Sequence, residues 1–350
     1  MAAAADFSSR LVPDRAGAAE LAREHNVVPV RLSVTDDCET PVSALLKLRE
    51  GGPCFLLESA ERGQVGRYSF IGTRPRSVLR WSDGVLREFP GTAMGPGAQV
   101  QEEIDAPDPY RAVADYMGRF DVAEVPGLPP FAGGAVGLFG YDLVRTVEPL
   151  GPPNPDPLGV PDLALMITDV LVIFDHLHNE LTILACAYVG DDGDVDAAYD
   201  DAVEKIGAVR ERLRGPVPDS GETSAVESPQ FESNLTKEEF EAMVARIIEY
   251  IYAGDAFQVV PSQRFTAESR VEPFSIYRGL RAVNPSPYMY FLEFGDFQIA
   301  GASPEPLLKV NGDIVEMTSG WGRLNKRVFR IKSVATDTFV LEGADTSNTT

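Results

Sequence analysis

Two short segments of the sequence combine polar side chains with apolar surroundings in a way that suits a small ligand. In the first, an apolar run ends in a carboxylate and a hydroxyl, Glu58 and Ser59, which at a strand end could hold an ammonium and a carboxylate group. In the second, Pro287, Tyr288 and Met289 offer a rigid turn, an aromatic face and an adaptable thioether, which suit an apolar aromatic ligand. Their chemistry alone is equally typical of core and turn structure, so both interpretations stay open at this point.

Two histidines suggest a different kind of site. His176 and His178 stand two residues apart beside Asp175 and Glu180, a spacing that could place two imidazoles on one strand face for a metal ion. The third histidine of the chain, His25, is distant in the sequence, and polar residues are common at hairpin tips. The pattern therefore favours a polar turn, and we expect no metal site.

Other constellations typical of enzymes are missing from the sequence. The glycine-rich stretch 133–140 matches neither a dinucleotide-binding nor a phosphate-binding loop, so it predicts an element packed too closely for side chains. Three histidines and no Gly-x-Ser-x-Gly motif leave no credible catalytic triad. Cys38, Cys54 and Cys186 form no CxxC pair, and we expect each to be a small buried hydrophobic residue in a reducing compartment.

Composition limits the possible partners. The 350 residues are 44% hydrophobic and 24% charged, which is typical of a globular protein with one large or two ordinary domains. A net charge of -22 argues against nucleic acid and anionic membranes as partners. No apolar run approaches the ~18 residues of a membrane span, and the N-terminus lacks the features of a secretory signal, so we expect a cytoplasmic location.

The elements that must position the two polar segments are mostly strands. From residue 27 to about 189, β-branched runs alternate with glycine and proline, and 163–174 with 181–186 is expected to form a hairpin around the polar turn 175–179. Residues 40–48 are expected to form a capped helix. Further elements are predicted as helices over 194–213 and 273–283 and as strands over 288–294 and 297–300.

The remaining third of the chain changes character twice. Residues 215–233 collect proline, glycine and serine, which indicates a linker. Thr236 and Glu239 then form a capping box. It opens a predicted helix with one apolar stripe: Phe240, Val244, Ile247, Ile248 and Ile251. Residues 318–350 hold five Lys/Arg and three Asp/Glu, a local charge of +2, and predict two short strands (328–334 and 338–341) before a loop over 343–350.

Seven motifs in a fixed order carry a family resemblance. Over residues of about 27–316 the chain resembles component I, the large subunit, of anthranilate synthase, a chorismate-utilising enzyme. The resemblance implies an α+β fold of large, mostly antiparallel β-sheets packed face to face with outer helices. The motifs lie at 37–42, 55–59, 66–72, 133–137, 140–142, 254–265 and 284–306.

The resemblance also implies a domain plan. Residues 1–26 would be an N-terminal arm, 27–214 the regulatory region, and 215–233 a linker. Residues 234–317 would begin the chorismate-binding domain without completing it. The final segment, 318–350, does not match the family and faintly resembles part of a phage tail-tube protein.

The family uses a feedback inhibitor, a metal and a partner. Its inhibitor, L-tryptophan, lies between the two polar segments described above, which implicates Glu58, Ser59, Pro287, Tyr288 and Met289. The full-length enzymes use Mg²⁺ and convert chorismate and ammonia, supplied from glutamine by a glutamine amidotransferase (glutaminase) subunit, to anthranilate and pyruvate.

The departure from the family begins after Glu316. The segments in which relatives place the Mg²⁺-binding glutamates and the catalytic residues do not follow. We therefore assign no catalytic residue and no metal ligand, expect no Mg²⁺ to bind, and predict an inactive chain that keeps the tryptophan-sensing part. Two alternatives remain: a fragment of the aminodeoxychorismate synthase large subunit, and a non-catalytic protein that either binds tryptophan or is an inert chimera.

Overall fold

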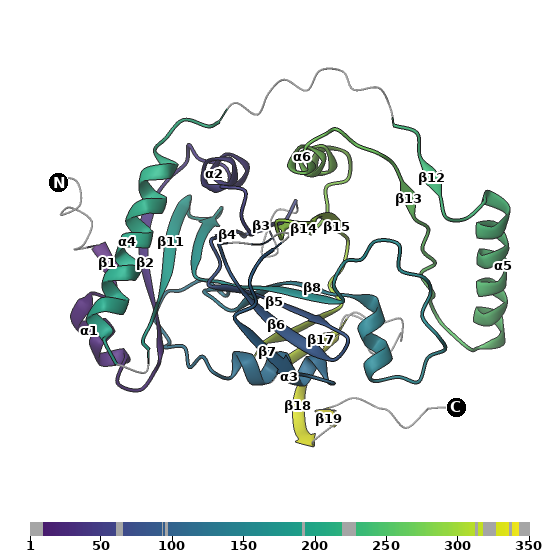
Figure 1. Cartoon of the computed structure of the whole chain (residues 1–350), viewed down its shortest axis with the longest axis horizontal. Coiled ribbons are helices and arrows are strands. Elements are labelled where there is room, and N and C mark those ends of the chain that lie inside the picture. Colours follow the sequence, from purple (N-terminus) through teal and green to yellow (C-terminus); the bar gives the residue numbers. More distant parts are fainter. Residues whose placement is uncertain are drawn as a thin grey trace. The chain divides into compact units, whose positions relative to one another are not determined.

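The computed structural model describes most of the chain (Figure 1). The described ranges are 10–60, 66–92, 94, 97–190, 193–218, 229–311, 314–317, 327–335 and 338–342. They separate into two compact units, the first formed by Met1–Ser220 with Ile276–Ala302 and the second by Gly221–Ser275 with Ser303–Thr350. Every helix in these ranges is too short or too polar to span a bilayer.

An eight-stranded sheet dominates the first unit. Its strand order is β1-β2-β11-β10-β4-β3-β14-β15, and each pairing from β1 to β14 is antiparallel. Strands β3 and β14 lie side by side although most of the chain separates them in sequence. The bounds are β1 Leu11–Val12, β2 Val27–Thr35, β3 Cys54–Glu58, β4 Tyr68–Thr73, β10 Val170–Asp175, β11 Glu180–Tyr188, β14 Tyr288–Glu293 and β15 Gln298–Ser303.

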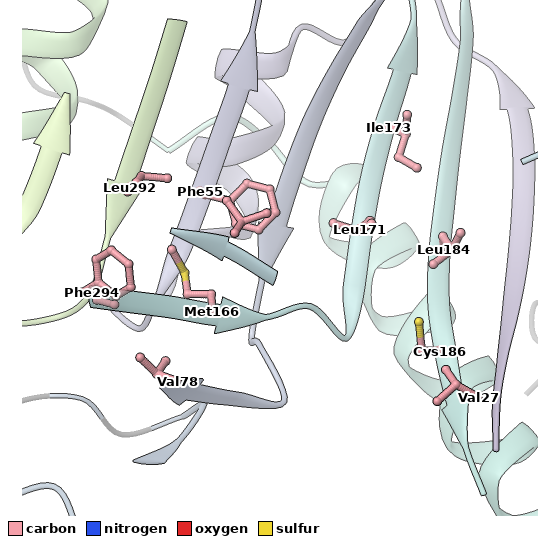
Figure 2. Packing of buried hydrophobic residues seen from close by; sticks show 12 residues of the cluster. Val27, Phe55, Val78, Met166, Leu171, Ile173, Leu184, Cys186, Leu292 and Phe294 are labelled. Atoms are coloured by element: carbon pink, nitrogen blue, oxygen red, sulfur yellow. The ribbon is translucent and has the colours of Figure 1, made fainter. Parts of the chain in front are cut away.

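A second, five-stranded antiparallel sheet packs against the first. Its order is β7-β6-β5-β9-β8. Phe55 and Leu292 of the large sheet share one buried cluster with Val78, Val136 and Met166 of the small one, and Figure 2 shows most of this packing. The bounds are β5 Ser77–Ser82, β6 Val85–Pro90, β7 Glu102–Asp105, β8 Ala135–Phe139 and β9 Leu163–Ile167.

Helices cover the outer faces of these sheets. Helix α4 packs on β11 and β2 and buries an apolar stripe that includes Ala202 and Ile206. Tyr116 of α3 joins a second apolar cluster on the five-stranded sheet. The predicted α+β class is confirmed, with large antiparallel sheets and outer helices. The helical bounds are α1 Arg15–Leu21, α2 Pro41–Leu48, α3 Pro109–Met117, η2 Tyr141–Thr146, α4 Val195–Leu213 and α6 Pro273–Val283.

Local sequence signals explain the start of α2. The Thr40 hydroxyl accepts a hydrogen bond from the Ser43 amide at 3.1 Å, and the Ser43 hydroxyl accepts one from the Thr40 amide at 2.9 Å. Pro41 occupies the first helical position, where its missing N–H costs nothing. The predicted helix start is confirmed.

The prediction of a single strand over 163–174 was wrong. The chain leaves the small sheet after β9 and enters the large sheet as β10, and Thr168 and Asp169 form the break. The Thr168 hydroxyl donates to the Gly134 carbonyl at 3.0 Å, while Lys205 donates to Asp169 at 2.6 Å. Both strands are buried on two sides, so no change of periodicity marked the break. The hairpin of β10 and β11 around the polar turn is confirmed.

Cys38 also departs from expectation. Cys54 and Cys186 are buried, as predicted, but Cys38 is exposed. Its amide donates to the Asp36 carboxylate at 3.0 Å, in the polar turn that leads into α2. The polar neighbours of Cys38 in the sequence were the available signal.

The second unit contains α5 (Lys237–Ala253), a short pair of strands and a four-stranded sheet. The predicted capping box at Thr236 and Glu239 is present, but α5 has no buried residue, so its apolar stripe is only half-buried or exposed. The predicted strands near the C-terminus correspond to β18 and β19, and the predicted loop 343–350 lies outside the described residues. The bounds are β12 Glu232–Ser233, β13 Phe265–Thr266, β16 Leu308–Asn311, β17 Ile314–Met317, β18 Arg327–Ala335 and β19 Thr338–Glu342.

Candidate functional site

The pairing of β3 with β14 brings together the two segments that carry the predicted site residues, Glu58–Ser59 and Pro287–Met289. In this antiparallel register Met289 is the partner of Glu58, and Tyr290 is the partner of Leu57. Just beyond the strands, the Ala60 amide donates to the Ser286 carbonyl at 3.0 Å. Ser59 and Pro287 are the chain neighbours of these two residues, so all five predicted site residues lie at one strand end.

Strand alternation divides these residues between two faces of the sheet. Glu58 and Met289 are register partners, and their side chains share the face that α6 covers, where Phe291 also contacts Tyr277. Leu57 and Tyr290 point to the opposite face and pack in the core between the sheets. The strand end is therefore accessible from a polar, helix-covered side and from an apolar, inter-sheet side.

Glu58 is the centre of a buried polar network on the α6 side. The Tyr277 hydroxyl donates to Glu58 Oε1 at 2.5 Å. Arg281 approaches the same carboxylate with Nε 2.6 Å from Oε1 and Nη2 2.9 Å from Oε2. The Glu58 side chain is 6% exposed and that of Arg281 is 41% exposed. Burial, together with the neighbouring Glu58 carboxylate, raises the pKa of Tyr277, which stays a neutral donor.

A small polar cavity of about 290 Å³ opens beside this network. Glu58 and Arg281 contribute to its wall, and Arg278 lies one helical turn before Arg281 on the same face of α6. Arg278 is exposed, and no ion pair or hydrogen bond joins it to the described part of the chain. The full lining is Glu58, Ser59, Ala60, Arg278, Arg281, Ala282 and Met289.

A larger cavity of about 700 Å³ lies on the inter-sheet side of the same strand end. Its walls are mostly aromatic and aliphatic, including Phe70, Phe131 and Phe139 as well as Tyr288 and Tyr290. Glu58 and Met289 line this cavity as well as the small one. An apolar cavity with a few polar groups at one end is the usual form of a site for a small organic ligand.

Comparison with known proteins gives this strand end a family context. Residues 53–319 match the family described as chorismate binding enzyme. The chain belongs to the chorismate binding enzyme family. This match covers more than half of the sequence and includes both polar segments and both cavities.

Within this family the chain is similar in sequence to anthranilate synthase component 1 of several bacteria. It is 41% identical over 300 residues to that protein from Pseudomonas putida, a match that covers 83% of this chain and 58% of the relative. The protein from Mycobacterium tuberculosis H37Rv is 41% identical over 304 residues, with the same two coverages. The crystal structure of anthranilate synthase component I from Streptococcus pneumoniae TIGR4 matches with a TM-score of 0.55 and 30% identity, covering 81% of this chain and 59% of that one.

These matches confirm the predicted resemblance. They also show that the chain spans less than two thirds of the length of the relatives it matches. The matches therefore show the family of this chain and not the activity, substrates or partners of the whole relatives.

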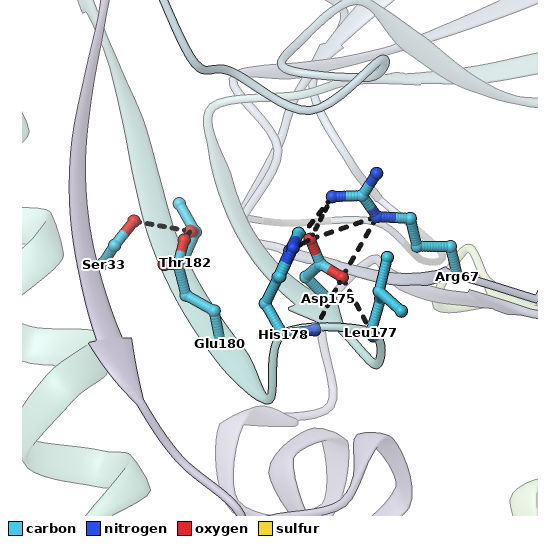
Figure 3. A network of polar contacts seen from close by, with 7 residues as sticks. All are labelled: Ser33, Arg67, Asp175, Leu177, His178, Glu180 and Thr182. Carbon is cyan, nitrogen blue, oxygen red and sulfur yellow. Dashed lines mark hydrogen bonds and ion pairs between the residues drawn. The ribbon is translucent and has the colours of Figure 1, made fainter. Parts of the chain in front are cut away.

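His176 and His178 lie in the turn that joins β10 to β11, and Figure 3 shows His178 in a polar network with Asp175 and Arg67. His176 Nε2 is 2.8 Å from the Ser69 hydroxyl, and His178 Nδ1 is 2.9 Å from Asp175 Oδ2. Arg67 donates to the same carboxylate at 2.7 Å and holds the pKa of Asp175 below its usual range, with smaller contributions from His178 and backbone amides. Across the described ranges, no group of three His, Cys, Asp or Glu residues is arranged to hold a metal ion.

The glycine-rich stretch has a packing role, as predicted. Gly137 lies in β8 beside β9, and a Cβ atom there would be 1.9 Å from the Ala164 carbonyl oxygen. Gly301 of β15 similarly lies beneath the Tyr290 ring, which a Cβ atom would approach to 2.0 Å. Gly137 and Tyr290 both line the large apolar cavity.

Sequence reasoning missed the contribution of α6. The sequence pattern predicts an ordinary helix over 273–283 and assigns no site role to Tyr277, Arg278 and Arg281. Their i, i+1 and i+4 spacing on an amphipathic helix just before the second polar segment was the available signal.

Proposed function

We propose that this chain carries the tryptophan-binding, N-terminal part of an anthranilate synthase component I and does not itself form anthranilate. The observation that carries the proposal is the β3–β14 register, which sets Glu58 opposite Met289 at the mouth of two cavities. In this proposal residues 27–214 act as the regulatory region and 215–233 as a linker. Residues 234–317 begin the chorismate-binding domain, and 318–350 are unrelated to it.

The two cavities suit the two ends of L-tryptophan. The larger one has the aromatic walls and the volume that an indole requires, with Tyr288 and Met289 at the strand end. The smaller one presents the charged groups of Glu58 and α6 beside Ser59. Pro287 lies in the turn that leads into β14 and fixes the approach of that strand.

In a full-length relative, tryptophan bound at this point would regulate a distant reaction. Such regulation requires that the ligand bind two conformations of the enzyme with different affinity. Glu58 and Met289 come from strands far apart in sequence, so a ligand that contacts both would favour one arrangement of these segments. We infer that the inhibited arrangement is the one favoured.

The reaction itself belongs to the full-length proteins. The resemblance implies conversion of chorismate and ammonia to anthranilate and pyruvate, with Mg²⁺ on the substrate carboxylates and ammonia from a glutamine amidotransferase subunit. In the described part of this chain no group of three acidic, histidine or cysteine side chains is placed to hold a metal ion, and we derive no step through Mg²⁺. Docking of the amidotransferase is likewise a property we propose only for a full-length protein.

The apolar stripe of helix α5 is partly exposed among the described residues. Ile248 is 46% exposed and Ile251 is 39% exposed on a helix with a well-formed apolar stripe and no buried residue. A helix with this pattern normally packs its stripe against other elements.

The proposal is tested by comparing the activity of this chain with that of a longer hybrid protein. Purified 1–350 should form no anthranilate from chorismate, ammonia and Mg²⁺, whereas a hybrid that joins residues 1–316 to the remaining C-terminal part of the Pseudomonas putida relative should do so. Anthranilate production by 1–350 alone would contradict the proposal.

A further inference from the structure

We propose that helix α6 supplies the carboxylate-binding half of the ligand site, with Arg278 as the residue that receives the α-carboxylate of an amino-acid ligand. The inference deepens the proposed function and rests on the same strand end. It goes beyond the predicted set of site residues, none of which is a cation. It also specifies which end of the ligand contributes most to affinity.

The Glu58 carboxylate is already paired within the protein. Its two carboxylate oxygens accept from Tyr277 at 2.5 Å and from Arg281 at 2.6 and 2.9 Å. A charge-assisted pair with two guanidinium contacts is a strong interaction, and Glu58 is almost fully buried. An incoming ammonium group must therefore compete with Arg281 for a carboxylate that is already paired.

The Arg278 guanidinium is available to a ligand. It lines the same small cavity as Glu58 and Arg281, and among the described residues it has no ion-pair partner. The cavity wall thus holds two guanidinium groups and one carboxylate, a net charge of +1. A site with this balance attracts a carboxylate more strongly than it attracts an isolated ammonium group.

The placement of the two guanidinium groups on α6 suits a carboxylate. A guanidinium presents a planar set of donors that matches a carboxylate in a two-point contact. Arg278 and Arg281 lie three residues apart on one face of α6, so both can approach a carboxylate placed between them and Ser59. The ligand ammonium would then lie toward Glu58, and the side chain would extend past Met289 into the apolar cavity, which Met289 also lines.

The consequence is a specific order of affinity among indole compounds. L-Tryptophan should bind best, and indole-3-propionate, which keeps the carboxylate but lacks the ammonium group, should retain most of that affinity. Tryptamine, which keeps the ammonium group but lacks the carboxylate, should bind far more weakly. If Glu58 were the main anchor, tryptamine would bind better than indole-3-propionate.

Calorimetric titration of the full chain with the three compounds tests the inference, using wild type, Arg278→Gln and the matched control Arg270→Gln. Arg270 is exposed and lines neither cavity, so its substitution makes the same charge change elsewhere. In Arg278→Gln, tryptophan and indole-3-propionate should each bind about 10- to 100-fold more weakly, the loss expected for one charge-assisted contact. Tryptamine binding should be unchanged, and Arg270→Gln should match wild type.

The possible failures are distinguishable. Equal binding of tryptamine and tryptophan to wild type, or equal losses in Arg278→Gln and Arg270→Gln, would overturn the role of Arg278 and leave the proposed tryptophan site standing. Absence of binding by all three compounds to a folded wild-type chain would overturn both proposals. Circular dichroism melting of each variant establishes that the chain is folded during the titration.

Discussion

Met289 of β14 lies directly opposite Glu58 of β3. The two strands are antiparallel and come from distant parts of the sequence of the first unit. Neither strand forms the candidate site alone, because Glu58 brings the buried charge and β14 brings the aromatic and thioether groups. Tyr277 and Arg281 of α6 bind Glu58 of β3, and the Tyr277 ring also contacts Phe291 of β14. The integrity of this strand end should therefore depend on a few polar contacts that can be tested separately.

Substitutions of Glu58 and Arg281 should have non-additive effects on the free energy of unfolding, because the two side chains form an ion pair. Arg281→Gln leaves the buried Glu58 carboxylate with Tyr277 as its remaining strong donor, and should lower the free energy of unfolding by about 1–3 kcal/mol. The double variant Glu58→Gln/Arg281→Gln should recover part of this loss, because no buried charge is then left unpaired. Urea unfolding of the four proteins in a double-mutant cycle gives the coupling; strictly additive effects would contradict the ion pair.

Glycine substitutions should have opposite effects in β8 and α6. Gly137→Ala places a Cβ atom 1.9 Å from the Ala164 carbonyl oxygen, so β8 and β9 must separate, and we expect a loss of at least about 1–3 kcal/mol. Gly279→Ala meets nothing within 4 Å and replaces a glycine inside a helix, so it should stabilise by about 0.5–1 kcal/mol. Thermal unfolding midpoints should move in opposite directions, and a harmless Gly137→Ala would show that the strands are not in close contact.

The hairpin-tip carboxylate should give a contribution to stability that depends on pH. Arg67 first, then His178 and backbone amides, hold the folded-state pKa of Asp175 below its unfolded value. A lowered pKa means that the stabilisation is fully present above the ordinary aspartate pKa of about 4 and is lost as pH falls toward the folded-state value. The difference in unfolding free energy between wild type and Asp175→Asn should thus be constant above about pH 5 and shrink below it.

Leu177→Ala provides the control for this pH dependence. Leu177 is exposed in the same turn, and its replacement removes no titratable group, so its effect should not vary with pH. If Asp175→Asn shows the same flat profile from about pH 2 to 7, the Arg67 contact does not act on Asp175 as described.

The exposed stripe of α5 should promote self-association. Ile248→Asp/Ile251→Asp places charges on side chains that are 46% and 39% exposed, so it should reduce light scattering at high protein concentration without lowering the unfolding midpoint. Ile183→Asp, at a position that is 1% exposed, should instead prevent folding. A loss of stability in the α5 variant comparable to that of Ile183→Asp would mean that the stripe is covered.

The sequence allowed good prediction of features fixed by neighbouring residues. The capped helix start at Thr40, the capping box at Thr236 and the β10–β11 hairpin depend on contacts within a few positions, and all were predicted. The division of 163–174 between two sheets was not, because strands buried on both faces show no change of pattern where the chain changes sheets.

The candidate site was likewise predicted only in part. The meeting of Glu58 with Met289 is a long-range pairing that residue chemistry could not predict, and it was expected only through the family resemblance. Tyr277 and Arg281 were missed because their role depends on which face of α6 turns toward β3, a tertiary property. The exposed position of Cys38 was missed because buried packing was assumed for every cysteine.

The most direct test of the account is a calorimetric titration of the purified chain with L-tryptophan, with Glu58→Gln and the surface control Glu103→Gln titrated in parallel. We predict saturable binding at one site per chain, weakened about tenfold or more by Glu58→Gln, which removes the charge that organises the strand end, and unchanged by Glu103→Gln. Absence of binding to the folded wild-type chain up to about 1 mM tryptophan, or equal binding by all three proteins, would contradict a tryptophan site between β3 and β14.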